Sequence, residues 1–214
     1  MKTIVARDLM EAATAIAPAA RRVMIGLTGP PGAGKSTLAV RLVDELSRAG
    51  HTTAYVPMDG YHLANSQLER LGLQDRKGAP ETFDAAGYVR MLATIAGRPA
   101  YTIYAPEFNR AIEEPIAGSI AITPDTDFVV TEGNYLLLDT PPWRDIRVYL
   151  DAAWYISIPD DVRRQRLVRR HMLFGKDRRD AEAWTDGSDA RNAALIAAHR
   201  DRADALIIGH EAET

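Results

Sequence analysis

The octapeptide GPPGAGKS, from Gly29 to Ser36, has the residue types and the spacing of a phosphate-binding loop. Its glycines allow backbone N–H groups to approach a polyanion closely, because side chains there would obstruct the approach. The helix expected after the loop adds roughly half a positive charge at its amino end. Lys35 can reach the β- and γ-phosphates of a nucleotide, and the Ser36 hydroxyl is a natural Mg²⁺ ligand. The expected nucleotide contacts are Gly29, Pro30, Pro31, Gly32, Ala33, Gly34, Lys35, Ser36 and Thr37.

Two acidic residues come where other expected strands end. Asp59 interrupts the apolar run in YVPMDGYHL (55–63), and Glu132 follows DFVVT. Because ligands of an open parallel sheet lie beyond the carboxyl ends of its strands, both carboxylates can converge on the phosphate loop. Phosphoryl transfer needs a carboxylate that orients and deprotonates the attacking hydroxyl, which suits Asp59. Glu132 could bind Mg²⁺, directly or through water, or accept a hydrogen bond from a substrate hydroxyl. The alternative for both Asp59 and Glu132 is that each is an ordinary turn residue before a glycine.

The residues after Asp59 have two interpretations each. Tyr61 and His62 either line the pocket of the phosphate acceptor or cover the edge of the sheet. Arg76 and Lys77 lie in a polar segment, where they either hold an anionic group of the acceptor or keep the loop soluble. The residues alone leave these alternatives open.

Strand-like and helix-like segments alternate along the chain, which predicts an α/β fold with a parallel sheet covered on both faces. The expected strands are 23–28, 53–58, 128–130, 154–158 and 205–208, with a two-stranded flap formed by 100–104 and 118–123. The expected helices are 4–17, 36–50, 85–96 with Asp84 as N-cap, 160–173 and 180–201. Residues 61–80 are expected to be irregular.

The segment DVRRQRLVRRHMLFGKDRRD (161–180) is strongly basic. On a helix, Arg163, Arg166 and Arg170 share one narrow face. Such a face could close over a nucleotide and set guanidinium groups against the transferring phosphoryl oxygens, with Gly175 as a hinge. The alternative is a solvated helix face whose charge is balanced by neighbouring aspartates.

Five motifs together resemble the superfamily of uridine kinases, phosphoribulokinases and type I pantothenate kinases: GPPGAGKST, MDGYHL, RKGAPETFD, VVTEGNYLLLD and RLVRRH. The resemblance spans roughly residues 22–208 and is closest to small bacterial kinases described as fructose-transport or nucleoside kinases. It implies a three-layer P-loop kinase fold with a central five-stranded parallel sheet, a small β flap and a helical lid. The stretch YAPEFNR departs from the histidine-containing sequence of the pantothenate enzymes, which argues against pantothenate as the substrate.

The resemblance also implies roles for particular residues. Asp59 matches the catalytic base of the superfamily, and Glu132 matches the glutamate on the magnesium and substrate side. Arg166 and Arg170 match its functional lid arginines, and Arg110 matches an acceptor contact in the flap. Asp189 and Asn192 match a late D-x-x-N-A pattern near the expected position of adenine. For Asp189, capping of a helix is an equally good explanation. ATP and Mg²⁺ are the implied cofactors.

Composition sets the remaining expectations. A chain of 214 residues is expected to form one domain, 1–214, with a docking helix in 1–20, a flap in 98–124 and a lid in 163–182. A net charge of −3 gives no reason to expect nucleic acid or a membrane surface as partner. The chain has no cysteine and no apolar run long enough to span a membrane, so a cytoplasmic location is expected. A homodimer would be compatible with the resemblance.

These observations predict an ATP-dependent kinase acting on a hydroxyl of a small metabolite, either a sugar such as fructose or a nucleoside. The alternatives are a pantothenate kinase, a nucleoside monophosphate kinase, and a regulatory ATPase that acts through a partner. A switch GTPase is disfavoured because the chain lacks the guanine-reading N-K-x-D segment.

Overall fold

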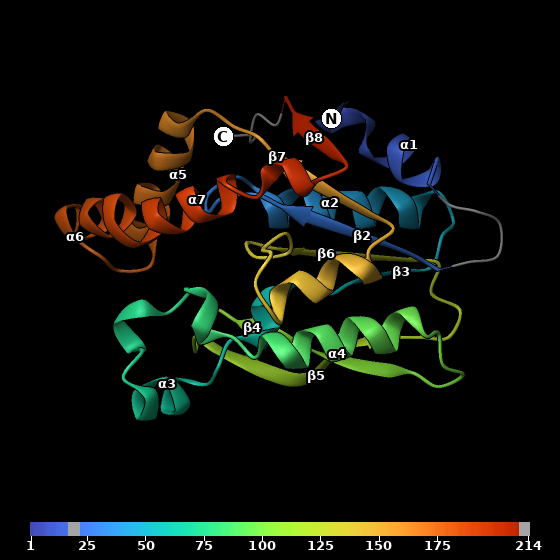
Figure 1. Cartoon of the computed structure of the whole chain (residues 1–214), viewed down its shortest axis with the longest axis horizontal. Helices are drawn as coiled ribbons and strands as arrows, with labels where there is room; N and C mark the ends of the chain where they lie inside the picture. Colours follow the sequence, from blue (N-terminus) through green and yellow to red (C-terminus); the bar gives the residue numbers. More distant parts are fainter. Residues whose placement is uncertain (17–21, 210–214) are drawn as a thin grey trace.

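A computed structural model describes residues 1–16 and 22–209, and its centre is a parallel β-sheet (Figure 1). Within the described residues the strand order is β1-β8-β7-β2-β6-β3, and all neighbouring strands run parallel. Their bounds are Lys2–Val5 (β1), Val23–Thr28 (β2), Thr53–Tyr55 (β3), Phe128–Gly133 (β6), Ala152–Ile156 (β7) and Ala205–Ile208 (β8). Every residue of β2 is buried, as expected for a central strand covered on both faces.

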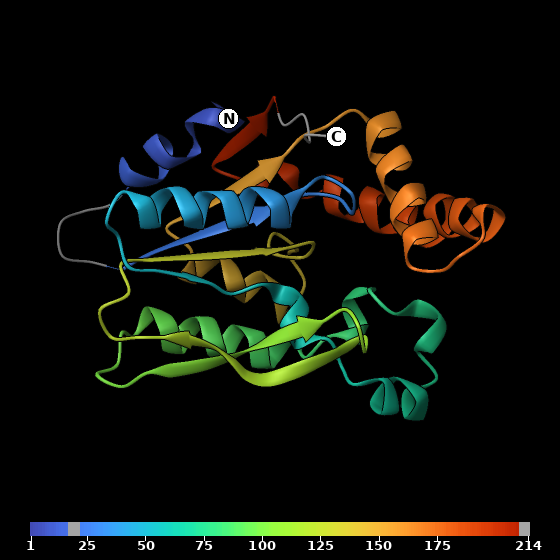
Figure 2. The same ribbon diagram turned by 180° about the vertical axis from the view of Figure 1, so that it is seen from behind.

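Helices cover both faces of this sheet (Figures 1 and 2). On one face, α1 (Leu9–Thr14) and α2 (Lys35–Arg48) pack on Ile25 and Leu27 of β2. On the other face, α4 (Ala85–Ala96), the 3₁₀ helix Trp143–Tyr149 and α7 (Ala190–Ala197) form a second core that includes Met24. Alternate residues of one strand therefore enter different cores, which confirms the α/β, three-layer fold.

The N-terminal segment differs from its expected helical form. Residues 4–17 were expected to form a docking helix, but the chain begins with strand β1, a 3₁₀ turn (Ala6–Asp8) and the short helix α1. Ile4 is buried and pairs in register with Ile207, because β8 offers an open edge for another parallel strand. The sheet thus gains a sixth strand beyond the five expected. Residue 17 of the expected helix, and residues 18–20 of the segment 1–20 assigned to it, lie outside the described residues.

The region between β3 and β6 builds the side of the molecule opposite α2. Strands β4 (Ile103–Asn109) and β5 (Glu114–Ile122) pair antiparallel where the flap was expected. The stretch 61–80, expected to be irregular, contains helix α3 (Asn65–Leu71). Asp84 caps α4 as predicted, since its carboxylate accepts a hydrogen bond from the Gly87 backbone N–H at 2.7 Å.

The basic segment forms two helices at one end of the sheet, at the left of Figure 1. Helix α5 (Asp160–Leu173) matches the prediction, and α6 (Arg178–Trp184) follows after a turn at Gly175. The helix expected over 180–201 is interrupted by a π-helical turn, Thr185–Asp189, which separates α6 from α7. Such turns are found frequently at functional sites. No helix in 1–16 or 22–209 has both the length and the apolar character needed to cross a bilayer.

Candidate active site

A cleft of about 900 Å³ lies where β2, β3 and β6 end. The phosphate loop follows β2, Asp59 lies four residues beyond the end of β3, and Glu132 is the next-to-last residue of β6. The flap and the lid helices complete the walls. Of the residues singled out from the sequence, the cleft is lined by Pro31, Gly32, Lys35, Ser36, Asp59, His62, Lys77, Arg110, Glu132, Arg170 and Asn192.

The phosphate loop is shaped by backbone geometry and by the lid helix behind it. Gly32 has φ +81°, and a Cβ there would meet the Arg163 carbonyl oxygen at 3.0 Å and Leu167 at 2.9 Å. The start of α5 therefore packs directly on the loop, which only a glycine at this position allows. Arg163 itself is buried and donates to Asp160 Oδ1 at 2.7 Å, so it braces the helix rather than entering the cleft.

The Lys35 side chain folds back onto the backbone of the phosphate loop. Its ammonium donates hydrogen bonds to the carbonyl oxygens of Gly29 (2.9 Å) and Pro30 (3.2 Å). Burial lowers the pKa of Lys35 to about 8, and the nearby carboxylates of Glu132 and Asp59 act in the opposite direction. A polyphosphate entering the loop would supply further negative charge and restore the cationic form.

Glu132 is the buried acidic group of the cleft, with only 4% of its surface exposed. Its Oε1 atom accepts hydrogen bonds from the Ser36 hydroxyl at 3.0 Å and from the Tyr55 phenol at 2.9 Å. Burial, followed by the nearby Asp59 carboxylate, raises the pKa of Glu132, whereas Lys35 and the two donors lower it. This pairing of a hydroxyl and a carboxylate at the phosphate loop provides the hard oxygen ligands that Mg²⁺ prefers.

Asp59 also lines the cleft, from the 3₁₀ helix Met58–Tyr61. Its carboxylate forms an ion pair with the Arg110 guanidinium at 3.4 Å, and both side chains are partly exposed. His62 lies beside it, with Nδ1 2.9 Å from the Asp59 carbonyl oxygen and its ring in tilted contact with the rings of Phe83 and Phe108. Burial lowers the pKa of His62.

The wall beyond Asp59 joins the segment after α3 to the tip of the flap. The Lys77 ammonium donates to Asn65 Oδ1 (2.8 Å) and to the Glu113 carbonyl oxygen (2.7 Å). It also lies 3.6 Å from the Glu113 carboxylate and 5.3 Å from the centre of the Phe108 ring. Lys77 therefore helps to shape this wall through contacts within the chain.

The lid contributes Arg170 and a partly buried histidine–carboxylate pair to the cleft. His171 Nε2 lies 2.7 Å from Asp189 Oδ2, and this contact joins α5 to the π-helical turn. Asp189 precedes α7 but makes no side-chain capping bond to it, so of the two accounts of Asp189 the capping one is wrong, and its carboxylate contacts His171 instead. Asn192 borders both the cleft and a smaller cavity of about 270 Å³ beside residues 75–81, which places it near the segment after α3.

Several residues singled out from the sequence lie outside the cleft lining. Tyr61 is buried with its ring in tilted contact with that of Tyr88, and its hydroxyl has no hydrogen-bond partner among the described residues. Arg76 forms an ion pair with Glu81 beside the smaller cavity. Arg166 lies on α5 away from the cleft lining. Of the phosphate-loop segment, Gly29, Pro30, Ala33, Gly34 and Thr37 are not part of the lining.

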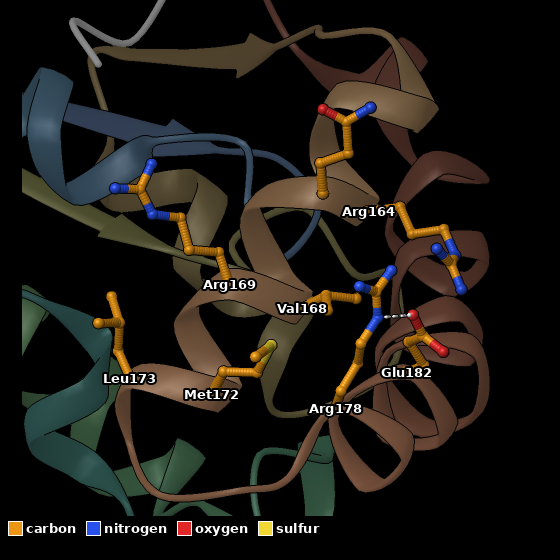
Figure 3. A pocket seen from close by; sticks show the side chains of 8 residues that line it. Arg164, Val168, Arg169, Met172, Leu173, Arg178 and Glu182 are labelled. Atoms are coloured by element: carbon orange, nitrogen blue, oxygen red, sulfur yellow. Dashed lines mark hydrogen bonds and ion pairs between the residues drawn. The ribbon is translucent and has the colours of Figure 1, made fainter.

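A separate groove of about 550 Å³ lies on the outer side of the lid, between α5 and α6 (Figure 3). It is lined by Val168, Met172 and Leu173, with arginines along its rim. Arg178 is paired with Glu182, one turn further along α6, at 2.9 Å. The groove contains no residue of the phosphate loop and neither Asp59 nor Glu132, so it is distinct from the candidate active site.

Sequence reasoning missed several residues of the cleft region. Tyr55 was assigned to a strand, and no local pattern marks it as a partner of Glu132. Glu113 and Trp184 also line the cleft. Glu113 contacts Lys77, which is distant in sequence, and Trp184 directly precedes the π-helical turn. A spacing rule could not have found them, because their roles depend on how the flap and the lid pack.

A phosphate loop after a central parallel strand, facing acidic residues at neighbouring strand ends, defines the class of P-loop kinases. Comparison with known proteins agrees. The chain is 35% identical over 187 residues to a candidate uridine kinase of Schizosaccharomyces pombe. The match covers 82% of this chain and 78% of that protein. It belongs to this family of P-loop kinases, and it is an ATP-dependent small-molecule kinase.

Solved structures and further relatives support the same family. A candidate fructose transport system kinase from Silicibacter shares 36% identity with a TM-score of 0.87, and the match covers 95% of this chain and 98% of that one. A pantothenate kinase of Mycolicibacterium vanbaalenii is 33% identical over 147 residues, which are 63% of this chain and 47% of the relative. The chain thus spans about half the length of that pantothenate kinase.

The family profile for the methylmalonyl Co-A mutase-associated GTPase MeaB matches residues 2–67. This stretch contains the phosphate loop and Asp59, but it ends before β6, the flap and the lid. The match therefore reflects the part of the fold that P-loop proteins share.

Proposed function

We propose that this chain transfers the γ-phosphate of ATP to a hydroxyl of a small, uncharged metabolite, namely a sugar such as fructose or a nucleoside. The observation that carries the proposal is that Asp59 lines the same cleft as Lys35, Ser36 and Glu132. An alcohol held between these groups would have a carboxylate on one side and the bound triphosphate on the other.

In the proposed reaction the acceptor oxygen attacks the γ-phosphorus, the bond from that phosphorus to the bridging oxygen breaks, and ADP leaves. Asp59 takes the proton of the hydroxyl, and Lys35 and Arg170 balance the charge on the phosphoryl oxygens. Ser36 and Glu132 would hold Mg²⁺, which when bound neutralises charge on the β- and γ-phosphates. Positioning and charge compensation therefore account for most of the catalysis expected here.

The charge balance beside Asp59 supports an uncharged acceptor. Lys77 is paired with Glu113, and Arg110 is paired with Asp59 itself. An acceptor that carries a carboxylate, as pantothenate does, would compete with these partners if it approached Lys77 or Arg110. A sugar or nucleoside could instead use hydrogen bonds and the apolar surface of Phe108, which also lines the cleft.

The test is a screen for ADP release from Mg·ATP with hexoses, nucleosides and pantothenate, with Lys35→Ala as the blank. We expect an uncharged polyol to stimulate release at least tenfold over ATP alone. Stimulation by pantothenate alone would overturn the assignment of acceptor class while retaining the kinase. Slow hydrolysis that no metabolite stimulates would instead favour a regulatory ATPase.

A further inference from the structure

Tyr55 lies on strand β3, beside the strand that carries Glu132. In the parallel ladder Tyr55 is the register partner of Val130. Because side chains alternate along a strand, Val130 and Glu132 lie on the same face of β6, which is the face covered by α2. The Tyr55 phenol therefore reaches along that face to the carboxylate two residues further on, at 2.9 Å.

Residues of three elements, β3, α2 and β6, meet at one oxygen atom. Oε1 of Glu132, on β6, accepts hydrogen bonds from Tyr55 of β3 and from Ser36 in the first turn of α2. The terminal torsion of a glutamate has a broad energy profile, so packing alone does not orient its carboxylate plane. Two donors from different elements can orient it. Within the described part of the chain both groups donate to Oε1, and Oε2 accepts no hydrogen bond.

We propose that Tyr55 is a positioning residue for the metal-binding carboxylate: its phenol holds Oε1 of Glu132 and thereby presents Oε2 to Mg²⁺ or to a water molecule of its shell. The inference rests on the proposed function, in which Ser36 and Glu132 hold the metal. Groups that orient metal ligands in this way typically change metal affinity or activity by about 10–100-fold when they are removed.

The phenol is suited to this role as a hydrogen-bond donor from a neighbouring strand. Burial raises the pKa of Tyr55 well above its ordinary value, and the adjacent Glu132 charge acts in the same direction. Tyr55 therefore remains a donor, and a phenylalanine at this position would keep the ring packed on the α2-side core. The hydroxyl can thus be removed with little change in shape.

The experiment compares Tyr55→Phe with the unaltered chain in binding a non-hydrolysable ATP analogue, by calorimetry, once with Mg²⁺ and once with EDTA. We expect the dissociation constant with Mg²⁺ to rise about tenfold or more, and the metal-free value to change less than about twofold. No acceptor is present, so the result is independent of whether the proposed transfer reaction is correct.

Tyr88→Phe is the matched control. The Tyr88 phenol also contacts β6, through the Thr131 hydroxyl, but from the opposite core. We expect this variant to bind the Mg²⁺ complex as the unaltered chain does. Equal loss in Tyr88→Phe and Tyr55→Phe, or equal loss with Mg²⁺ and with EDTA, would overturn the positioning role.

A double variant distinguishes positioning from general loss of structure. If Tyr55 acts through Glu132, adding Tyr55→Phe to Glu132→Gln should weaken Mg²⁺-dependent binding by less than about twofold beyond the single variant. A full additional loss would show that Tyr55 does not act through this carboxylate. Mn²⁺ binding followed by electron paramagnetic resonance gives a second readout, in which Tyr55→Phe should release the ion at lower competitor concentration.

Discussion

The carboxylate of Asp59 and the guanidinium of Arg110, two residues that line the cleft, form an ion pair at 3.4 Å. Arg110 belongs to the turn between the flap strands, whereas Asp59 follows β3, so the pair joins the flap to the sheet. We propose that the same contact orients the base and balances its charge before a substrate arrives. We therefore expect flap position and base orientation to be coupled.

Asp59→Asn should lower kcat by about 10²–10⁴-fold, because the amide cannot accept the proton of the attacking hydroxyl. Nucleotide affinity should stay within about twofold, since Asp59 does not contact the phosphate loop in the described structure. Steady-state ADP release and calorimetry with ADP measure the two quantities. Turnover at the original rate would rule out the base assignment.

Arg110→Gln should change folding and catalysis to different extents. The ion pair is partly exposed, so its loss should change the free energy of unfolding by less than about 1 kcal/mol. We expect kcat/KM for the acceptor to fall by about tenfold, because Asp59 loses its orienting partner. Chemical denaturation and initial rates test this, with the exposed α4 variant Arg90→Gln as control. A loss of stability with unaltered kinetics would contradict the prediction.

Nucleotide binding should weaken as the pH rises above 8. The pKa of Lys35 is about 8 in the nucleotide-free chain, whereas the bound phosphates favour the protonated ammonium. Binding above pH 8 must therefore take up a proton, and the affinity for metal-free ADP should fall by up to about tenfold per pH unit. Calorimetry from about pH 7 to about pH 9.5 measures the slope. Lys35→Arg, which keeps its charge, should lack this slope, and a flat profile for the unaltered chain would count against the assignment.

Gly32→Ala should disturb both the phosphate loop and the lid. Its φ is +81°, and the added Cβ would approach the Arg163 carbonyl oxygen and Leu167. We expect a loss of about 1–3 kcal/mol in stability and at least tenfold weaker nucleotide binding. Gly50→Ala is the control, because Gly50 has φ +93° but open space around its Cβ position. If both variants bind nucleotide equally well, close packing of α5 on the loop is not required.

Much of the nucleotide half was predictable from local sequence. The phosphate loop lies within one continuous segment, so residue type and spacing determine its backbone conformation and its chemistry. The cap formed by Asp84 on α4 is likewise local, since donor and acceptor are three residues apart. The helical period of 4–17 was misleading, because pairing of Ile4 beside Ile207 on the open edge of β8 depends on a strand near the other end of the chain.

By itself, the sequence determined that the chain is an α/β protein with a phosphate loop and carboxylates near other strand ends, because periodicity and motif spacing are local properties. Only the tertiary structure decided that Tyr55 and Ser36 share one oxygen of Glu132, across 77 and 96 positions of sequence, and that Arg170 rather than Arg163 lines the cleft. Strand order, register and helix packing bring such residues together, and each depends on the free energy of the whole fold.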